Sequence, residues 1–208
     1  PALAVLPAGS GNDFAAGAGL PRDRAALLAA LRAGRTRTVD VVTVTGGGRI
    51  RSVVNSAGLH LTGEVAAARA HGGYASALVR VMQRPPAAVT MAVQADGRSR
   101  ALAAAGLAVC NGAREGGGFR VAPAARVDDG RFDYVLLEAL PAWRLALLVP
   151  TTLAGRHGGC TGVTGGTARV LTVQVARPVA MHLDGEATMA AAGPWRFAVN
   201  PGALRVIG

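Results

Sequence analysis

Lysine is absent from the sequence, and all 22 of its basic residues are arginine. A chain without lysine cannot use the lysine of a Walker A loop, the strand lysine of a protein kinase or a Schiff-base lysine. If the protein handles phosphate, it must do so with backbone amides, arginine and a metal ion. The 12 acidic residues leave a formal net charge of +10, which suits an anionic membrane leaflet or a phosphorylated partner.

Aromatic residues and cysteines are also scarce. Only 4% of the residues are aromatic, and no stacking pattern accompanies the scattered arginines, so the composition argues against nucleic-acid binding. Cys110 and Cys160 lack metal-ligand spacing and are predicted to be buried free thiols in a reducing cytosol. No apolar run approaches the length of a membrane span, and no signal peptide is visible. These features favour a cytoplasmic protein.

The pattern of predicted elements divides the chain near residues 34–38. Residues 3–6 read as a short strand, a glycine-rich turn follows, Asn12 or Asp13 can cap a short helix, and a second helix runs from Pro21 to Gly34. Strand, glycine-rich turn and helix in this order are typical of an α/β nucleotide domain. The sequence therefore predicts part of an α/β domain in residues 1–36.

Residues 37–208 have a different texture. The 29 glycines and 11 prolines of the chain favour many turns, and helices are predicted only at 64–70, 74–83 and 143–153. Strands are predicted at 37–45, 49–56, 88–94, 99–109, 132–137, 169–176, 179–183 and 195–199. The second part is thus predicted to be a mostly antiparallel β-sandwich domain.

The turn Gly9-Ser10-Gly11-Asn12-Asp13 lies between a predicted strand and a predicted helix. Glycines allow backbone N–H groups to approach an anion closely, the helix N-terminus adds partial positive charge, and Ser10 offers a hydroxyl. A tight turn that binds no ligand explains the same residues equally well. Taken alone, the motif leaves both readings open.

The tripeptide Asp184-Gly185-Glu186 follows an apolar strand. Two carboxylates around a glycine can place a general base beside a second acidic group or a metal ion. An ordinary Asp-Gly turn is the competing interpretation, and Asp96-Gly97 supplies an internal comparison with the same dipeptide between two alternating strands. On its own the motif favours the turn.

Two further segments carry chemistry-bearing residues. Adjacent acids in Asp128-Asp129-Gly130 suit either a cation or a solvated turn, and the glycine-rich loop 111–118 either approaches a ligand or only connects strands. The histidines show no metal-ligand spacing and are predicted to be structural: His60, His71, His157 and His182.

Together these segments resemble, in order and spacing, the bacterial diacylglycerol kinase family, which also includes sphingosine and ceramide kinases. The resemblance covers essentially the whole chain. It rests on Leu6-Pro7-Ala8-Gly9-Ser10-Gly11-Asn12-Asp13-Phe14-Ala15, Asn55-Ser56-Ala57-Gly58, Asn111, Gly116-Gly117-Gly118, Ala122-Pro123-Ala124-Ala125-Arg126-Val127-Asp128-Asp129-Gly130, Gly155-Arg156-His157, Asp184-Gly185-Glu186 and Asn200-Pro201-Gly202-Ala203-Leu204.

The resemblance implies an ATP-dependent lipid kinase of two domains that phosphorylates diacylglycerol or a related lipid at the inner membrane leaflet, and it leaves a homodimer open. It implies that Gly9, Ser10, Gly11, Asn12 and Asp13 contact nucleotide, and that Asn55 and Gly58 contact substrate. A structural Mg²⁺ would lie at Asp129 with the backbone carbonyls of Arg126 and Arg131. Asp184 or Glu186 would be the base, with Asp184 the first choice.

Two departures from the family pattern affect these expectations. The Gly-Gly-Asp-Gly-Thr phosphate loop of the family is expected upstream of Pro1, so residues 1–208 alone are not expected to use ATP. Where the family commonly has Gly-Phe-Asp, this chain has His60-Leu61-Thr62, which leaves the lipid open. An NAD kinase-like enzyme and a non-catalytic lipid-binding homologue are the alternatives.

Overall fold

A computed structural model describes residues 1–9 and 11–208. Its N-terminal part contains two helices, α1 (Asp13–Gly17) and α2 (Arg24–Arg32). The Asp23 carboxylate caps α2 by accepting a hydrogen bond from the Ala26 N–H at 2.7 Å, and Gly34, in the left-handed region, follows its end. The helix predicted after Pro21 is therefore confirmed, with Asp23 as its N-cap and not in its first turn.

The remainder is dominated by one antiparallel sheet. Its strands are paired in the order β10-β9-β3-β5-β4-β8-β11-β1-β2, with β6 beside β5 and β7 beside β6. Their bounds are β1 Thr36–Gly46, β2 Arg49–Val53, β3 Ser56–His60, β4 Val89–Ala95, β5 Arg98–Cys110, β6 Phe132–Glu138, β7 Val163–Ala168, β8 Val170–Val175, β9 Val179–Leu183, β10 Glu186–Ala190 and β11 Gly193–Ile207.

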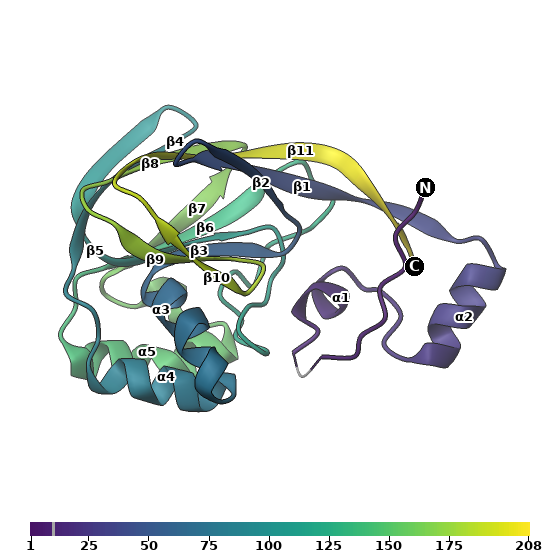
Figure 1. Ribbon diagram of the computed structural model, residues 1–208, viewed down its shortest axis with the longest axis horizontal. Coiled ribbons are helices and arrows are strands. Elements are labelled where there is room, and N and C mark those ends of the chain that lie inside the picture. The colour runs from purple at the N-terminus through teal and green to yellow at the C-terminus, as the bar shows by residue number, and fades with distance from the viewer. Residues whose placement is uncertain (10) are drawn as a thin grey trace.

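This sheet curls over on itself around the main core. Figure 1 shows β4, β8 and β11 along its upper side, with β3, β9 and β10 below them. The long strand β5 makes the turn between the two sides, because its first half pairs with β4 and its second half pairs with both β3 and β6. Side chains such as Phe132, Phe197 and Met91 fill the space between the two sides. The predicted antiparallel β domain is confirmed.

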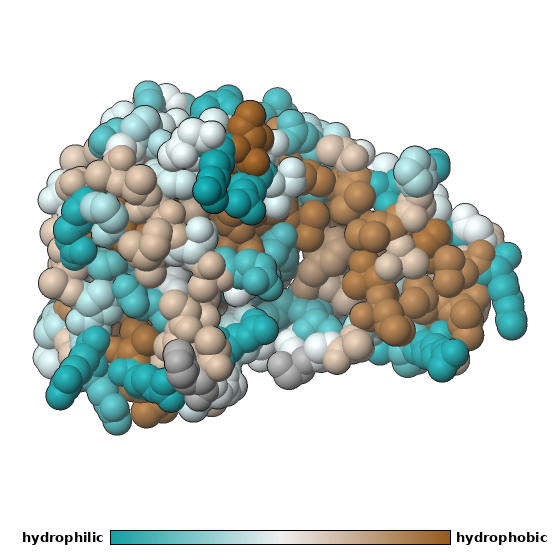
Figure 2. Space-filling model, in the orientation of Figure 1, coloured by the Kyte–Doolittle hydropathy of each residue, from teal (hydrophilic) through white to brown (hydrophobic). Residues whose placement is uncertain are grey.

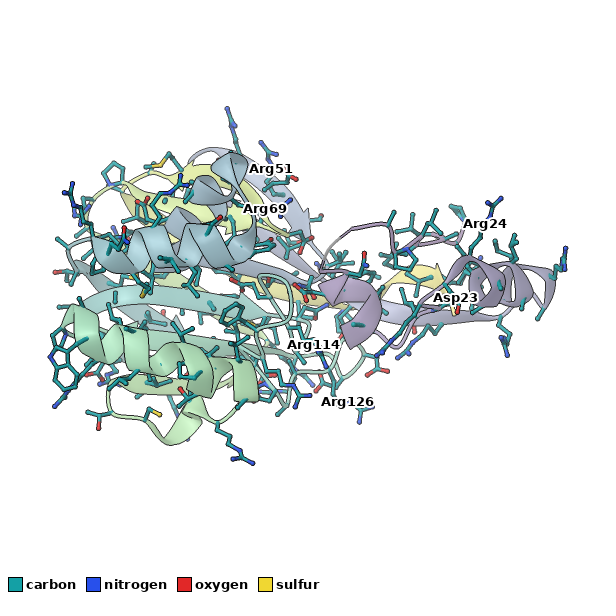
Figure 3. All side chains as sticks on the ribbon, turned by 90° about the horizontal axis from the view of Figure 1, so that it is seen from below. Asp23, Arg24, Arg51, Arg69, Arg114 and Arg126 are labelled. Carbon is teal, nitrogen blue, oxygen red and sulfur yellow. The ribbon has the colours of Figure 1, made fainter. Side chains whose placement is uncertain are left out.

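Three helices cover the outer face of the lower side: α3 (Leu61–Ala68), α4 (Tyr74–Gln83) and α5 (Ala142–Ala154). Seen from below in Figure 3, α4 and α5 lie side by side across this face, and they contact each other. These helices leave a space between themselves and the sheet, and the candidate site occupies it.

The first and last strands of the β domain form a long ribbon that reaches the N-terminal part. β1 pairs with β11 from Thr36 to Thr45, and Val206 and Ile207 at the end of β11 pack against the segment that carries α1 and α2. Apolar side chains remain exposed on that N-terminal part (Figure 2), among them Leu3, Leu6, Leu28 and Leu31.

Some sequence-based expectations are wrong in detail. The strand predicted at residues 3–6 is reduced to a single bridge between Leu3 and Val206, because the described chain places no further strand beside it. Residues 49–56 do not form one strand: the backbone leaves β2 after Val53 and enters β3 at Ser56. The short strands β7 and β10 were not predicted. Cys110 is a buried free thiol, as predicted, whereas Cys160 is free but only partly buried.

Candidate active site

A cavity of about 460 Å³ connects the N-terminal turn with the helices that cover the sheet. At one end it is lined by Gly9, Gly11 and Asp13, and Asp184 lines it beside the β2–β3 junction. At the other end its walls are apolar side chains of α3, α4, α5 and the outer sheet face: Leu61, Val65, Leu78, Met82, Leu137, Leu145, Leu148 and Val149. The cavity thus joins a polar region to an apolar one.

The glycine-rich turn before α1 is held in place by its own side chains. The backbone of Asn12 has the left-handed conformation. Its side-chain Oδ1 accepts the Gly9 N–H at 3.0 Å, and its Nδ2 donates to the Gly9 carbonyl at 2.6 Å. Asn12 thus braces the turn and does not cap α1 through its side chain. Ser10, the other residue predicted to bind nucleotide here, lies outside the described residues.

Asp13 ties this turn to the glycine-rich loop that follows β5. Its Oδ2 accepts the Gly117 N–H at 2.7 Å, and Gly11 approaches so closely that a Cβ there would lie 3.0 Å from the Gly117 Cα. A larger residue at position 11 would therefore press the two loops apart by a few tenths of an ångström. Two of the predicted motifs, far apart in sequence, line one end of the cavity together.

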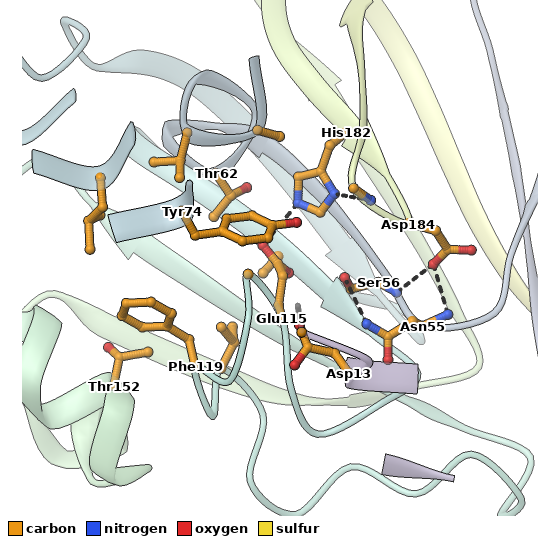
Figure 4. A pocket seen from close by; sticks show the side chains of 18 of the residues that line it. Asp13, Asn55, Ser56, Thr62, Tyr74, Glu115, Phe119, Thr152, His182 and Asp184 are labelled. Carbon is orange, nitrogen blue, oxygen red and sulfur yellow. Dashed lines mark hydrogen bonds and ion pairs between the residues drawn. The ribbon is translucent and has the colours of Figure 1, made fainter. Parts of the chain in front are cut away.

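The Asp184-Gly185 dipeptide forms the two-residue turn between β9 and β10. Both residues have positive φ values, 49° and 87°, as the favoured hairpin turns require. The Asp184 carboxylate accepts the backbone N–H groups of Val54, Asn55 and Ser56 at 2.9–3.0 Å, which fixes its orientation (Figure 4). Glu186 is exposed on β10.

Asp96-Gly97 makes the same kind of turn between β4 and β5, with φ values of 43° and 87°. The Asp96 carboxylate also accepts backbone N–H groups, those of Arg169 and Val170. Hydrogen bonding to a neighbouring strand therefore does not distinguish the two turns. Their positions do, because Asp184 lines the cavity and Asp96 lies at the β4–β5 turn, where its side chain pairs with Arg131.

Of the two predicted substrate residues, Asn55 lies in the cavity wall with Asp184, and Gly58 lies behind that wall. Asn55 lines the cavity and is buried, and its side chain donates to the Arg114 carbonyl at 2.9 Å. Its backbone carbonyl accepts the N–H groups of Asn111 and Gly112. Gly58 is packed under other side chains, since a Cβ there would collide with Thr62 and with the ring of His182. Asn55 thus faces the cavity, and Gly58 makes room for residues that line it.

Sequence reasoning missed an ion pair between Glu115 and His182, which the structure places in the cavity wall. His182 Nε2 lies 2.9 Å from Glu115 Oε1, and both residues line the cavity (Figure 4). Burial opposes charge on both, but their attraction prevails: the pKa of His182 is raised and the pKa of Glu115 is lowered. The Gly185 backbone nitrogen lies 3.4 Å from His182 Nδ1.

The segment that departs from the family pattern borders this pair. His60 has a φ of 66°, a conformation in which glycine, the family's usual residue at this place, is free of strain. Thr62 packs against Gly58, next to the His182 ring, and in the described chain its buried hydroxyl oxygen has no hydrogen-bond partner. Nearby, the Arg69 guanidinium donates to the Tyr74 hydroxyl at 2.7 Å.

The predicted metal residues lie on the loop before β6, outside the cavity lining. The exposed Asp129 accepts the Arg131 N–H at 3.0 Å. Burial, together with the negative charge of Asp129, raises the pKa of Asp133 to about 6. A cation here would relieve that repulsion, and Mg²⁺ prefers carboxylate and carbonyl oxygens. The oxygen atoms of Asp129 and of the neighbouring carbonyls are thus of the chemical type that Mg²⁺ prefers. In the described residues, no group of three or more His, Cys, Asp or Glu side chains is placed to hold a metal ion.

Comparisons with known proteins agree with this arrangement. Residues 48–208 match the family model described as the YegS C-terminal NAD kinase beta sandwich-like domain. Residues 1–44 match the diacylglycerol kinase catalytic domain. The chain belongs to the bacterial diacylglycerol kinase-like family of lipid kinases. The division predicted between residues 36 and 37 remains a prediction.

Members of this family resemble the chain over almost its whole length. A protein of Pseudomonas aeruginosa (strain UCBPP-PA14) named "Probable lipid kinase YegS-like" is 32% identical over 98% of this chain and 67% of its own length. A protein of the same name from Stenotrophomonas maltophilia is 27% identical, covering 99% of this chain and 69% of the relative. The crystal structure of a diacylglycerol kinase from Bacillus anthracis str. Sterne has the same fold, with a TM-score of 0.73, 18% identity, and coverage of 100% of this chain and 66% of that one.

Proposed function

We propose that the protein is a lipid kinase that transfers the γ-phosphoryl group of ATP to the hydroxyl group of diacylglycerol or a related lipid. The observation that carries the proposal is the single cavity that joins the Gly9–Asp13 turn, the Asp184 carboxylate and an apolar compartment under the helices. A kinase for a membrane lipid needs a place for phosphate, a base near the hydroxyl and room for an acyl chain. This cavity offers the three side by side.

Asp184 is the residue that we assign to the base. The lipid hydroxyl oxygen would form a bond to the γ-phosphorus as the bond to the β–γ bridging oxygen breaks, with ADP leaving and the hydroxyl proton passing to the carboxylate. The three backbone N–H donors would hold the carboxylate in position for this transfer. Between the two candidates, the geometry favours Asp184, because Asp184 lines the cavity and Glu186 does not.

The nucleotide side of the reaction would rely on the glycine-rich turn. Phosphate oxygens would lie beside Gly11 at the mouth of the cavity, since the Gly9 N–H is already bound to the Asn12 side chain. Asp129 and the backbone carbonyls of Arg126 and Arg131 would hold Mg²⁺. When bound, the ion would supply positive charge that stabilises the loop before β6. The absence of lysine leaves arginine as the only side-chain cation with a permanent charge.

Lipid phosphorylation by the full-length protein tests the proposal. The protein would be incubated with labelled ATP, Mg²⁺ and mixed micelles of diacylglycerol or ceramide, with NAD in a parallel reaction. We expect labelled phospholipid and no labelled NADP. Labelling of NAD alone would instead support an NAD kinase-like enzyme, and lipid binding without any labelled product would support a non-catalytic homologue.

A further inference from the structure

The helix α5 is apolar on both of its sides. Its inner side chains Leu145, Leu148 and Val149 line the cavity. On its outer side, Trp143 and Leu147 are 59% and 61% exposed, and Leu153 is 48% exposed. A surface helix normally turns polar residues to water, and one that is apolar all round is normally covered on all sides. The outer face of α5 is therefore expected to have a covering partner.

The charges on α4 and α5 are of one sign. Residues 74–84, which are α4 and its C-cap, and residues 142–156, which are α5 and the two residues after it, contain no aspartate or glutamate. They carry four exposed arginines, Arg80, Arg84, Arg144 and Arg156. The Arg144 guanidinium lies 5.1 Å from the centre of the Trp143 ring, a pairing of cation and indole that suits the boundary between headgroups and acyl chains.

From these features we infer that the outer face of α5, with the arginines of α4 beside it, docks on the surface of an anionic lipid bilayer. The inference rests on the proposed lipid kinase function, since a lipid acceptor would leave that bilayer for the cavity on the inner side of the same helix. In the described part of the chain no helix is long and apolar enough to cross a membrane. α5, with 13 residues, would lie along the surface.

Binding to vesicles that contain no acceptor lipid tests the docking face without any catalytic step. The full-length protein would be sedimented with vesicles of phosphatidylglycerol and phosphatidylethanolamine, without ATP. We expect the Trp143→Ser/Leu147→Ser double variant to lose about tenfold or more in vesicle affinity. The Arg80→Gln/Arg84→Gln variant should lose about fivefold for each arginine at low salt, and less at high salt.

Ile50→Ser is the matched control, because Ile50 is 72% exposed on β2, across the molecule from α5 in Figure 1. It should bind as the parent does. Tryptophan emission gives a second readout: Trp195 is only 7% exposed, so a blue shift and protection from iodide on adding vesicles would report Trp143. Equal binding by the parent and the double variant would overturn the inference. A parent dimer in buffer that the double variant converts to monomer would overturn it too, in favour of self-association.

A water-soluble short-chain diacylglycerol separates this inference from the proposed function. If the double variant phosphorylates that substrate at the parental rate while losing vesicle affinity, both stand. If the parent phosphorylates no lipid but binds vesicles through α5, only the proposed function fails. If the parent phosphorylates the short-chain lipid and never binds vesicles, only the docking inference fails.

Discussion

Two aspartates with the same backbone conformation allow a matched test of the assigned base. Asp184→Asn should lower turnover of the full-length protein about 10²–10⁴-fold, the usual range for a lost general base. Asp96→Asn changes the equivalent position of the β4–β5 turn, far from the cavity wall, and should leave turnover near the parental value. Circular dichroism of both variants would establish that the fold is kept. Near-parental turnover in Asp184→Asn would remove Asp184 from this role.

Because of the Glu115–His182 pair, we expect the free energy of unfolding to fall both at low pH and at high pH. Because the pKa of His182 is raised above 6.5, its contribution is complete below that value and is lost as the pH rises through the folded pKa. Because the pKa of Glu115 is lowered below 4.5, its contribution is complete above 4.5 and is lost as the pH falls through the folded pKa. The pair should therefore stabilise the fold most between these two values.

Glu115→Gln tests this account of the pair. It should cost about 1–3 kcal/mol near pH 6 and flatten the dependence of unfolding free energy on pH above 6.5. His182, followed by NMR titration, should then show a lower pKa than in the parent protein. A His182 pKa that stays raised in the variant would contradict the assignment to Glu115.

Asp133 should report a cation at Asp129. Since part of the rise in the pKa of Asp133 to about 6 comes from the charge of Asp129, Asp129→Asn should lower that pKa. Adding Mg²⁺ should lower it in the parent and have no effect in the variant, as followed by carboxyl NMR titration. Asp23→Asn, which changes an acidic cap remote from this loop, is a control. An Mg²⁺ response that persists in Asp129→Asn would place the metal elsewhere.

Among the elements, α5 forms the wall between the cavity and the outer surface. Leu148→Trp would fill part of the apolar compartment and should raise the KM of a dioctanoyl lipid more than that of a dihexanoyl lipid. Ala146→Trp adds the same side chain to the exposed side of the helix and should leave the ratio of the two KM values unchanged. Both lipids would be used below their micelle concentrations. Equal KM changes for both chain lengths would argue against this compartment as the acyl site.

The elements also differ in how readily the sequence predicts them. The helix predicted after Pro21 ends at a glycine, the helix over residues 74–83 stops before Pro85-Pro86, and the structure confirms both. No local sequence pattern marks the break between β2 and β3, because a residue far away in the sequence stabilises it: the Asp184 carboxylate accepts the backbone N–H groups of residues 54–56. A strand at residues 3–6 was expected from local apolar character, but a strand needs a neighbour.

The candidate site shows the same limit. Motif order indicated the turn at Gly9–Asp13 and the acid at Asp184, and the structure brings both to one cavity. The contact between Glu115 and His182 joins positions 67 residues apart, and no spacing rule connects them. The apolar compartment is likewise built from side chains of three helices and the sheet, so its existence follows only from their packing.

At the scale of the whole molecule, the β1–β11 ribbon connects the two parts of the chain. Deleting residues 198–208 would leave most of β1 without its partner and remove Val206 and Ile207 from the packing around α1 and α2. We expect the truncated protein to aggregate, since an unpaired strand edge recruits other chains. Size-exclusion chromatography after expression at low temperature would measure this; a monomeric, folded product would contradict it.

That ribbon also bears on how the protein emerges from the ribosome. β1 is synthesised first, and its partner β11 follows about 160 residues later. Until then the nascent chain would carry an open strand edge and apolar side chains of alanine, valine and leucine. Contacts of such long sequence separation slow folding, so the waiting period during translation is the time at which this protein would most depend on a chaperone.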